Sequence, residues 1–122
     1  PINDTIDGEA VRAAAHEDIN LITLLVSGTQ EGLQVLTKQN TWLDIKSNPG
    51  WLVINIGDML SECSDGYFPS TTHRVINPLN LDKKISRYTM PLFMHPKDDV
   101  ILSKKYTAKS FLEERLKELG LK

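Results

Sequence analysis

Two residues of types that bind metal ions lie two positions apart near the start of the chain. His16 and Asp18 stand in the stretch HEDINLITLL, directly before a run of apolar and β-branched residues. Side chains two residues apart on an extended segment project to the same face. The pair is therefore either a polar loop before an ordinary strand or part of a metal site on one face of a sheet.

A third ligand would complete such a site, and the only other histidines in the sequence are His73 and His95. His73 stands in the β-branched stretch TTHRVI, where packing does not require a histidine. Two neutral imidazoles and one carboxylate suit Fe(II) and leave coordination positions open. O₂ chemistry requires open positions, and the net positive charge of such a site would attract a bidentate anionic co-substrate.

A cation would be needed to hold the far end of that co-substrate. Arg87 lies on the last predicted strand, and a guanidinium can bond a carboxylate through two parallel hydrogen bonds. Thr89, two residues further on, would share its face and can donate a hydroxyl hydrogen bond. An H-x-D pair, a sheet histidine and an arginine are each weak signals alone. Their order and their placement on strands make the combination more specific.

The elements that must carry these residues are mostly short strands. Strands are predicted over residues 21–26, 32–37, 41–45, 51–56, 71–76 and 85–94, with the second and third joined as a hairpin. Pro91 indicates an edge or a bulge in the last strand. A short helix capped by Asp58 and a longer helix from about Thr107 to a stop at Gly120 are also predicted. This order favours an all-β sandwich or jelly roll with a C-terminal helix.

Composition limits the class of protein. The 122 residues are 40% hydrophobic and carry a net charge of −2, which predicts one soluble domain over residues 1–122. No basic stretch predicts nucleic-acid binding, and no apolar run reaches the roughly 18 residues that a membrane helix needs. The single cysteine, Cys63, fits a reducing, cytoplasmic compartment and is expected to be buried. Trp42 and Trp51 are expected to pack against the sheet.

Five stretches together resemble the C-terminal catalytic part of the isopenicillin N synthase-like Fe(II)/2-oxoglutarate oxygenases. They are HEDINLITLLV (16–26), GLQVL (32–36), NPGWLVINIGDML (48–60), STTHRVINP (70–78) and RYTMPLFMHP (87–96). The resemblance implies a double-stranded β-helix (jelly roll) in which His16, Asp18 and His73 hold iron. It also implies that Arg87 and Thr89 bind the distal carboxylate of 2-oxoglutarate, with Thr in place of the family's Ser.

The resemblance implies an activity as well. A small organic substrate would be hydroxylated or desaturated by O₂ while 2-oxoglutarate is converted to succinate and CO₂. Family members carry a further strand before the H-x-D pair, so we expect the jelly roll to lack its first strand and the exposed edge to favour a homodimer. Two alternatives stay open: an oxidase like isopenicillin N synthase that does not use 2-oxoglutarate, and a metal-binding jelly-roll fragment without turnover.

Overall fold

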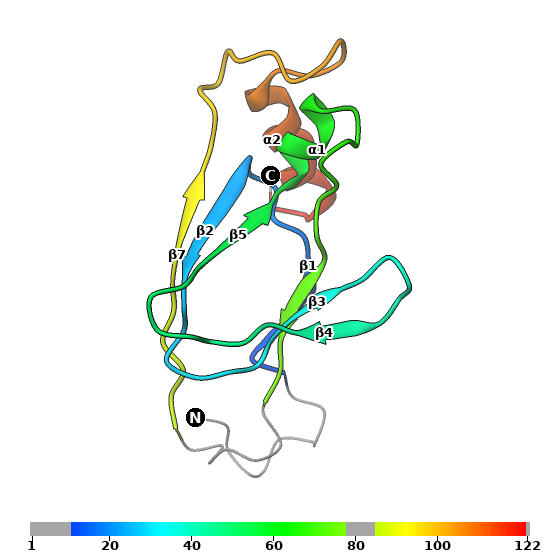
Figure 1. Cartoon of the computed structure of the whole chain (residues 1–122). Helices are drawn as coiled ribbons and strands as arrows, with labels where there is room; N and C mark the ends of the chain where they lie inside the picture. The colour runs from blue at the N-terminus through cyan, green and yellow to red at the C-terminus, as the bar shows by residue number, and fades with distance from the viewer. Residues whose placement is uncertain (1–10, 78–84, 122) are drawn as a thin grey trace. The chain divides into compact units, whose positions relative to one another are not determined.

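The computed structural model describes residues 11–77 and 85–121, which fall into two compact units. Of the described residues, the first unit comprises 11–16, 26–52, 72–77 and 85–90, and the second comprises 17–25, 53–71 and 91–121. Each unit is built around a β-sheet, and both helices belong to the second unit (Figure 1). In the part of the chain that the structure describes, no helix is long and apolar enough to cross a membrane.

A four-stranded antiparallel sheet forms the first unit. In spatial order its strands are β1 (Ala13–His16), β6 (His73–Val75), β3 (Leu33–Leu36) and β4 (Trp42–Asp44). β3 and β4 make the predicted hairpin, whose turn holds Asn40 at a φ of 56°, a conformation that asparagine tolerates. β1 and β6 are far apart in the sequence, and their pairing places His16 opposite His73. This pairing is what positions the two histidines.

The second unit contains nearly all of a three-stranded sheet. Its strand order is β5 (Leu52–Ile56), β2 (Ile22–Val26) and β7 (Met90–Met94). β7 is an edge strand, which agrees with the prediction from Pro91, because proline cannot donate a ladder hydrogen bond. The predicted strand over 85–94 is too long. Before β7 the backbone N–H of Tyr88 bonds the side-chain oxygen of Thr29 instead of a neighbouring strand, at 3.0 Å.

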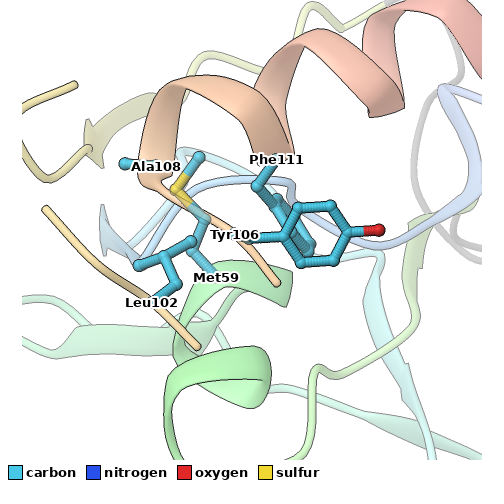
Figure 2. Close-up of a cluster of buried hydrophobic side chains, with 5 residues drawn as sticks. All are labelled: Met59, Leu102, Tyr106, Ala108 and Phe111. Atoms are coloured by element: carbon cyan, nitrogen blue, oxygen red, sulfur yellow. The ribbon is translucent and has the colours of Figure 1, made fainter. Parts of the chain in front are cut away.

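Two helices and a loop make the core of the second unit. The helices are α1 (Asp58–Cys63) and α2 (Ala108–Glu118). The buried cluster consists of Met59, Leu102, Tyr106, Ala108 and Phe111 (Figure 2). The rings of Tyr106 and Phe111 meet edge to face with centroids 5.2 Å apart. Burying a side chain as large as Phe111 stabilises the fold by roughly 1.5–3 kcal/mol.

The ends of α2 follow from its sequence. The hydroxyl of Thr107 accepts a hydrogen bond from the Ser110 N–H, and the Ser110 side chain accepts one from the Thr107 N–H, which forms a capping box. Gly120 has a φ of 71°, the left-handed conformation that ends many helices. The apolar residues of this segment are only partly buried, since Phe111 is in the core whereas Leu119 is 63% exposed.

Two predictions of burial are wrong. Cys63 is exposed because it is the last residue of α1, whose buried residue is Met59. Trp51 is 62% exposed and precedes β5 rather than packing against a sheet. Trp42 does contact a neighbour: the guanidinium of Arg74 lies 4.0 Å from its ring centroid.

Candidate metal centre

The first unit brings the two predicted histidine ligands together. His16 ends β1, His73 begins β6, and the two residues are direct partners in the antiparallel pairing. Their ring centroids lie 4.3 Å apart and the rings are inclined by 53°. On its other side His73 pairs with Val35 of β3, so the sheet fixes its backbone from both sides. Two imidazoles this close can act as ligands of one ion.

A hydrogen bond identifies which nitrogen of His16 is suited to a metal. Its Nδ1 lies 2.7 Å from the carbonyl oxygen of Ala14. A carbonyl oxygen can only accept, so Nδ1 carries the hydrogen, and in the neutral ring Nε2 carries the lone pair. Histidine ligands are commonly oriented by such a bond from the second ring nitrogen to a backbone carbonyl. His16 therefore offers Nε2 as its ligand atom.

Asp18 belongs to the second unit. β1 ends at His16, so Asp18 follows the strand instead of lying on it, which differs from the predicted placement on a sheet face. Its side chain is buried, with 8% exposed. The Oδ2 atom accepts hydrogen bonds from Thr23 Oγ1 at 2.6 Å and from Asn55 Nδ2 at 2.8 Å. These donors satisfy one oxygen of a carboxylate that would otherwise be costly to bury.

The backbone around Asp18 is fixed by the start of α1. The N–H groups of Asp58 and Met59 donate to the carbonyl oxygens of Asp18 and Asn20, at 2.8 and 3.2 Å. The first N–H groups of a helix have no acceptor inside the helix, and the segment around Asp18 supplies carbonyl acceptors for two of them. The predicted capping role of Asp58 is wrong, because Gly57 is the N-cap residue and there is no side-chain cap hydrogen bond.

The environment of Asp58 changes its acidity. Burial raises the pKa of Asp58 above its ordinary value, a hydrogen bond with Ser70 lowers that pKa by less, and the charge of Glu17 raises it further. A negative charge is therefore disfavoured at the first residue of α1. Asp58 begins α1, and its backbone N–H is hydrogen-bonded to the Asp18 carbonyl oxygen. The sequence did not predict Asp58 as a metal ligand.

The predicted anion-binding residues lie in the first unit, before β7 and outside any strand. Arg87 Nε donates to the Gln30 carbonyl oxygen at 3.0 Å. A Cβ atom on Gly28 would lie 2.9 Å from Arg87 Nη2, so the guanidinium packs against the backbone of Gly28. Burial lowers the pKa of Arg87, and the positive charge of Arg12 lowers it further. Thr89 is exposed.

Sequence reasoning missed the role of Arg12. Its Nε donates to Asn77 Oδ1 at 3.0 Å and its Nη2 donates to the Ile85 carbonyl oxygen at 3.1 Å. Its Nη1 is buried and has no hydrogen-bond partner among the described residues. A buried cationic N–H without an acceptor is costly, so two arginines whose charges interact favour an anionic ligand in this unit.

The hydrogen bonds of Thr23 and Asn55 to Asp18 were not predicted, although the sequence carries a signal for these residues. Asn55 interrupts the apolar strand WLVINI, and Thr23 stands within ITLLV. A polar side chain inside an apolar strand needs a hydrogen-bond partner when it is buried. His95, the third histidine, is exposed, and Arg74 bonds Gln34 of the neighbouring strand at 2.8 Å.

Known proteins are similar to this chain in both sequence and fold. The profile of the 2OG-Fe(II) oxygenase superfamily matches residues 3–96. The 2-oxoglutarate-dependent dioxygenase gloE of Glarea lozoyensis is 37% identical over 101 residues, which cover 83% of this chain and 30% of the relative. A crystal structure of a candidate oxygenase from Shewanella oneidensis is 57% identical, with a TM-score of 0.89 over 100% of this chain and 45% of that one.

A further solved structure contains alpha-KG. This full-length protein of Neurospora crassa, in complex with alpha-KG, is 26% identical, with a TM-score of 0.81 over 93% of this chain and 39% of that one. The chain thus spans less than half the length of each of these relatives. The antiparallel sheet and these structural relatives agree with an all-β fold. Because the profile covers well over half of its residues, the chain belongs to the 2OG-Fe(II) oxygenase superfamily.

Proposed function

We propose that residues 1–122 form a jelly-roll catalytic domain of an Fe(II)- and 2-oxoglutarate-dependent oxygenase. The reaction would oxidise a small organic substrate with O₂ and convert 2-oxoglutarate to succinate and CO₂. The observation that carries this proposal is the pair of imidazoles on β1 and β6, with ring centroids 4.3 Å apart. Membership of the superfamily indicates the class of reaction. His16, Asp18 and His73 are the proposed metal ligands.

His16, Asp18 and His73 would hold the metal. His16 contributes Nε2, because its Nδ1 is bonded to the Ala14 carbonyl oxygen. One residue separates His16 from Asp18, so the covalent chain keeps their Cα atoms within about 7 Å of each other. Two imidazoles and one carboxylate are the donor set expected for non-haem Fe(II), and the residues present fit that ion. When bound, Fe(II) with 2-oxoglutarate supplies the activation of O₂ and the oxidising power.

Arg87 and Thr89 would hold the distal carboxylate of 2-oxoglutarate. The Nε of Arg87 is bonded to the Gln30 carbonyl oxygen, which orients the guanidinium and leaves its two terminal nitrogens to approach a carboxylate. The charge of Arg12 adds to the positive potential at Arg87. The dianion would therefore be bound by charge at both ends, which orients its keto acid group toward the metal.

The matched relatives favour the 2-oxoglutarate-dependent reaction over an oxidase that does not use this co-substrate. The Glarea relative is a 2-oxoglutarate-dependent dioxygenase, and the Neurospora structure holds alpha-KG. Succinate release distinguishes the two reactions. The third possibility, a metal-binding fragment without turnover, predicts that the purified chain consumes no 2-oxoglutarate in the presence or absence of substrate.

Anaerobic addition of Fe(II) and 2-oxoglutarate to the purified chain tests the proposal. We expect a weak visible charge-transfer band from the chelated metal, together with succinate release when O₂ is admitted. His73→Ala should lose the band because one of the two imidazoles is removed. His95→Ala is the matched control, since His95 is exposed and is not a proposed ligand. A band that persists in His73→Ala and is lost in His95→Ala would contradict the ligand assignment.

We also propose that two copies of the chain associate through β7. This strand is at the edge of its sheet, and all of its residues are exposed, among them Met90, Leu92 and Phe93. An exposed apolar edge strand can pair with another chain. Sedimentation velocity over a range of concentrations should show a dimer that Leu92→Lys weakens. A clean monomer at high concentration would contradict this part of the proposal.

A further inference from the structure

A group of buried polar side chains surrounds Asp18 in the second unit. The exposed fractions are 2% for Asn20, 5% for Thr23 and 8% for Asp18. Burying polar groups costs free energy unless each finds a hydrogen-bond partner. An apolar set of side chains would fill this space without that cost. The arrangement therefore calls for an explanation beyond packing.

The shorter hydrogen bonds between these side chains lead toward the carboxylate, and a longer one of 3.4 Å runs from Thr23 Oγ1 to Asn20 Oδ1. The amide nitrogen of Asn20 donates to Thr23 Oγ1 at 3.0 Å, and Thr23 Oγ1 donates to Asp18 Oδ2 at 2.6 Å. A hydroxyl has one hydrogen, so accepting from Asn20 leaves that hydrogen for the carboxylate. The distance of 2.6 Å lies within the normal range for a hydroxyl donor.

A second donor reaches the same oxygen from another strand. Asn55 on β5 donates through Nδ2 to Asp18 Oδ2 at 2.8 Å. Thr23 and Asn55 thus approach one oxygen from two strands, β2 and β5, which are neighbours in the sheet. Two donors on one carboxylate oxygen prevent rotation of the group about its Cβ–Cγ bond.

The position of Asn20 is itself fixed. A Cβ atom on Gly57 would lie 2.1 Å from the backbone oxygen of Asn20 and 2.7 Å from its Oδ1. Only glycine leaves room for Asn20 in this place. The Asn20 amide also donates to the Ile22 carbonyl oxygen at 2.9 Å, so its orientation is set from two sides. The Asn20 amide that donates to the Thr23 hydroxyl is therefore held in one orientation.

We infer that Thr23 and Asn55 are positioning residues of the metal centre. They bind Oδ2 of Asp18, hold the carboxylate in one orientation and assign metal ligation to its other oxygen, Oδ1. The inference rests on the proposed function, because it requires Asp18 to be a metal ligand. Removing the partner of a metal-ligating group typically weakens metal affinity 10- to 100-fold.

Binding of Co(II) to the purified chain tests this inference without turnover. Isothermal titration calorimetry gives the Kd, and the visible d–d absorption of Co(II) reports the geometry of its ligands. Thr23→Val keeps the shape of the side chain and removes the hydroxyl, whereas Thr23→Ser restores the hydroxyl. Asn55→Ala removes the second donor from a half-buried position. The matched control is Thr41→Val, since Thr41 is an exposed threonine of the β3–β4 turn whose hydroxyl bonds Thr37.

We expect Thr23→Val and Asn55→Ala each to raise the Kd for Co(II) roughly 10- to 100-fold and to alter the d–d band. Thr23→Ser should return both close to wild type, and Thr41→Val should leave them unchanged. A purely structural role would lower the melting temperature of Thr23→Val without changing the Kd or the band of the folded protein.

Two results would overturn the inference, and they differ in what they say about the proposed function. If the wild type binds Co(II), His73→Ala does not, and the folded Asn55→Ala and Thr23→Val variants bind with the wild-type Kd, the positioning role is wrong while the metal centre stands. If the wild type binds no Co(II), both are wrong. Asn55→Ala decides the matter if Thr23→Val does not fold.

Discussion

At the scale of single residues, the Arg87 guanidinium can lie against the backbone of Gly28 because Gly28 has no side chain. An added Cβ would lie 2.9 Å from Nη2 of Arg87, a distance that real Cβ contacts essentially never show. Because the contacted atoms end a flexible side chain, we expect Gly28→Ala to fold normally while displacing the guanidinium. The affinity for 2-oxoglutarate should fall about tenfold, the loss of roughly one hydrogen bond to a charged group. Calorimetry on protein loaded with Mn(II) measures this affinity.

A double-mutant cycle separates that effect from a general disturbance of the loop. In an Arg87→Ala background the added methyl group of Gly28→Ala has no guanidinium to displace. The second substitution should then leave the affinity for 2-oxoglutarate unchanged. Equal losses from Gly28→Ala in both backgrounds would show that Gly28 acts through something other than Arg87.

The types of the site residues were predictable from the sequence, but the contacts that orient them were not. His16 stands out because it lies two residues before Asp18, and His73 stands out because histidine is not needed for packing in the β-branched stretch TTHRVI. The ligand atom of His16 depends on the carbonyl oxygen of Ala14, and every residue has a carbonyl group. The two donors to Asp18 come from Thr23 and Asn55, which converge only when β2 and β5 pair.

At the scale of elements, α1 begins where a glycine meets the segment that carries Asp18. Gly57 has a φ of −99°, which any residue can adopt. Glycine is therefore needed here because a side chain would not fit, and not because of the backbone conformation. A Cβ would lie 2.1 Å from the backbone oxygen of Asn20. We expect Gly57→Ala to lower the free energy of unfolding by about 3 kcal/mol or more, because backbone must move to accept it. Urea denaturation measures the change.

Gly66 provides the matched control for that prediction. It has a φ of 76°, and a Cβ there would meet nothing within 4 Å. Gly66→Ala therefore suffers only the strain of a left-handed residue, about 1 kcal/mol. If Gly66→Ala destabilised the chain more than Gly57→Ala, the close approach of α1 to the Asp18 segment would not matter to stability.

Short strands and helix ends were predicted from local sequence patterns. The errors arose where contacts between distant residues determine the structure. The hairpin of β3 and β4 and the capping box at Thr107 depend on neighbours in the sequence. The strand β1 was not predicted, because AAAH has neither alternation nor β-branched residues. It is extended because its partner β6 supplies hydrogen bonds from a distant part of the chain. The N-cap residue of α1 was predicted wrongly for the same reason. The carbonyl oxygens of Asp18 and Asn20 accept from the first N–H groups of the helix, and no side chain caps it.

At the scale of the whole molecule, the chain passes between its two units five times. Neither unit is a continuous stretch of sequence, so no linker marks a boundary and composition gave no sign of one. Unfolding one unit would pull on several segments of the other. We therefore expect the chain to unfold in a single cooperative transition, as most domains of this size do.

Metal binding should stabilise the folded chain in this transition, because the proposed ligands His16, Asp18 and His73 come together only on folding. An ion that binds only the folded state, at 100 times its Kd, adds about 2.7 kcal/mol to the free energy of unfolding. For a chain of this length that raises the melting temperature by about 10 °C. Scanning calorimetry with Co(II) should show the shift in wild type and in His95→Ala but not in His73→Ala. Hydrogen exchange should slow in β1 and β6, which carry the two histidines. Exchange in these strands that Co(II) leaves unchanged would contradict the assignment of His16 and His73 as ligands.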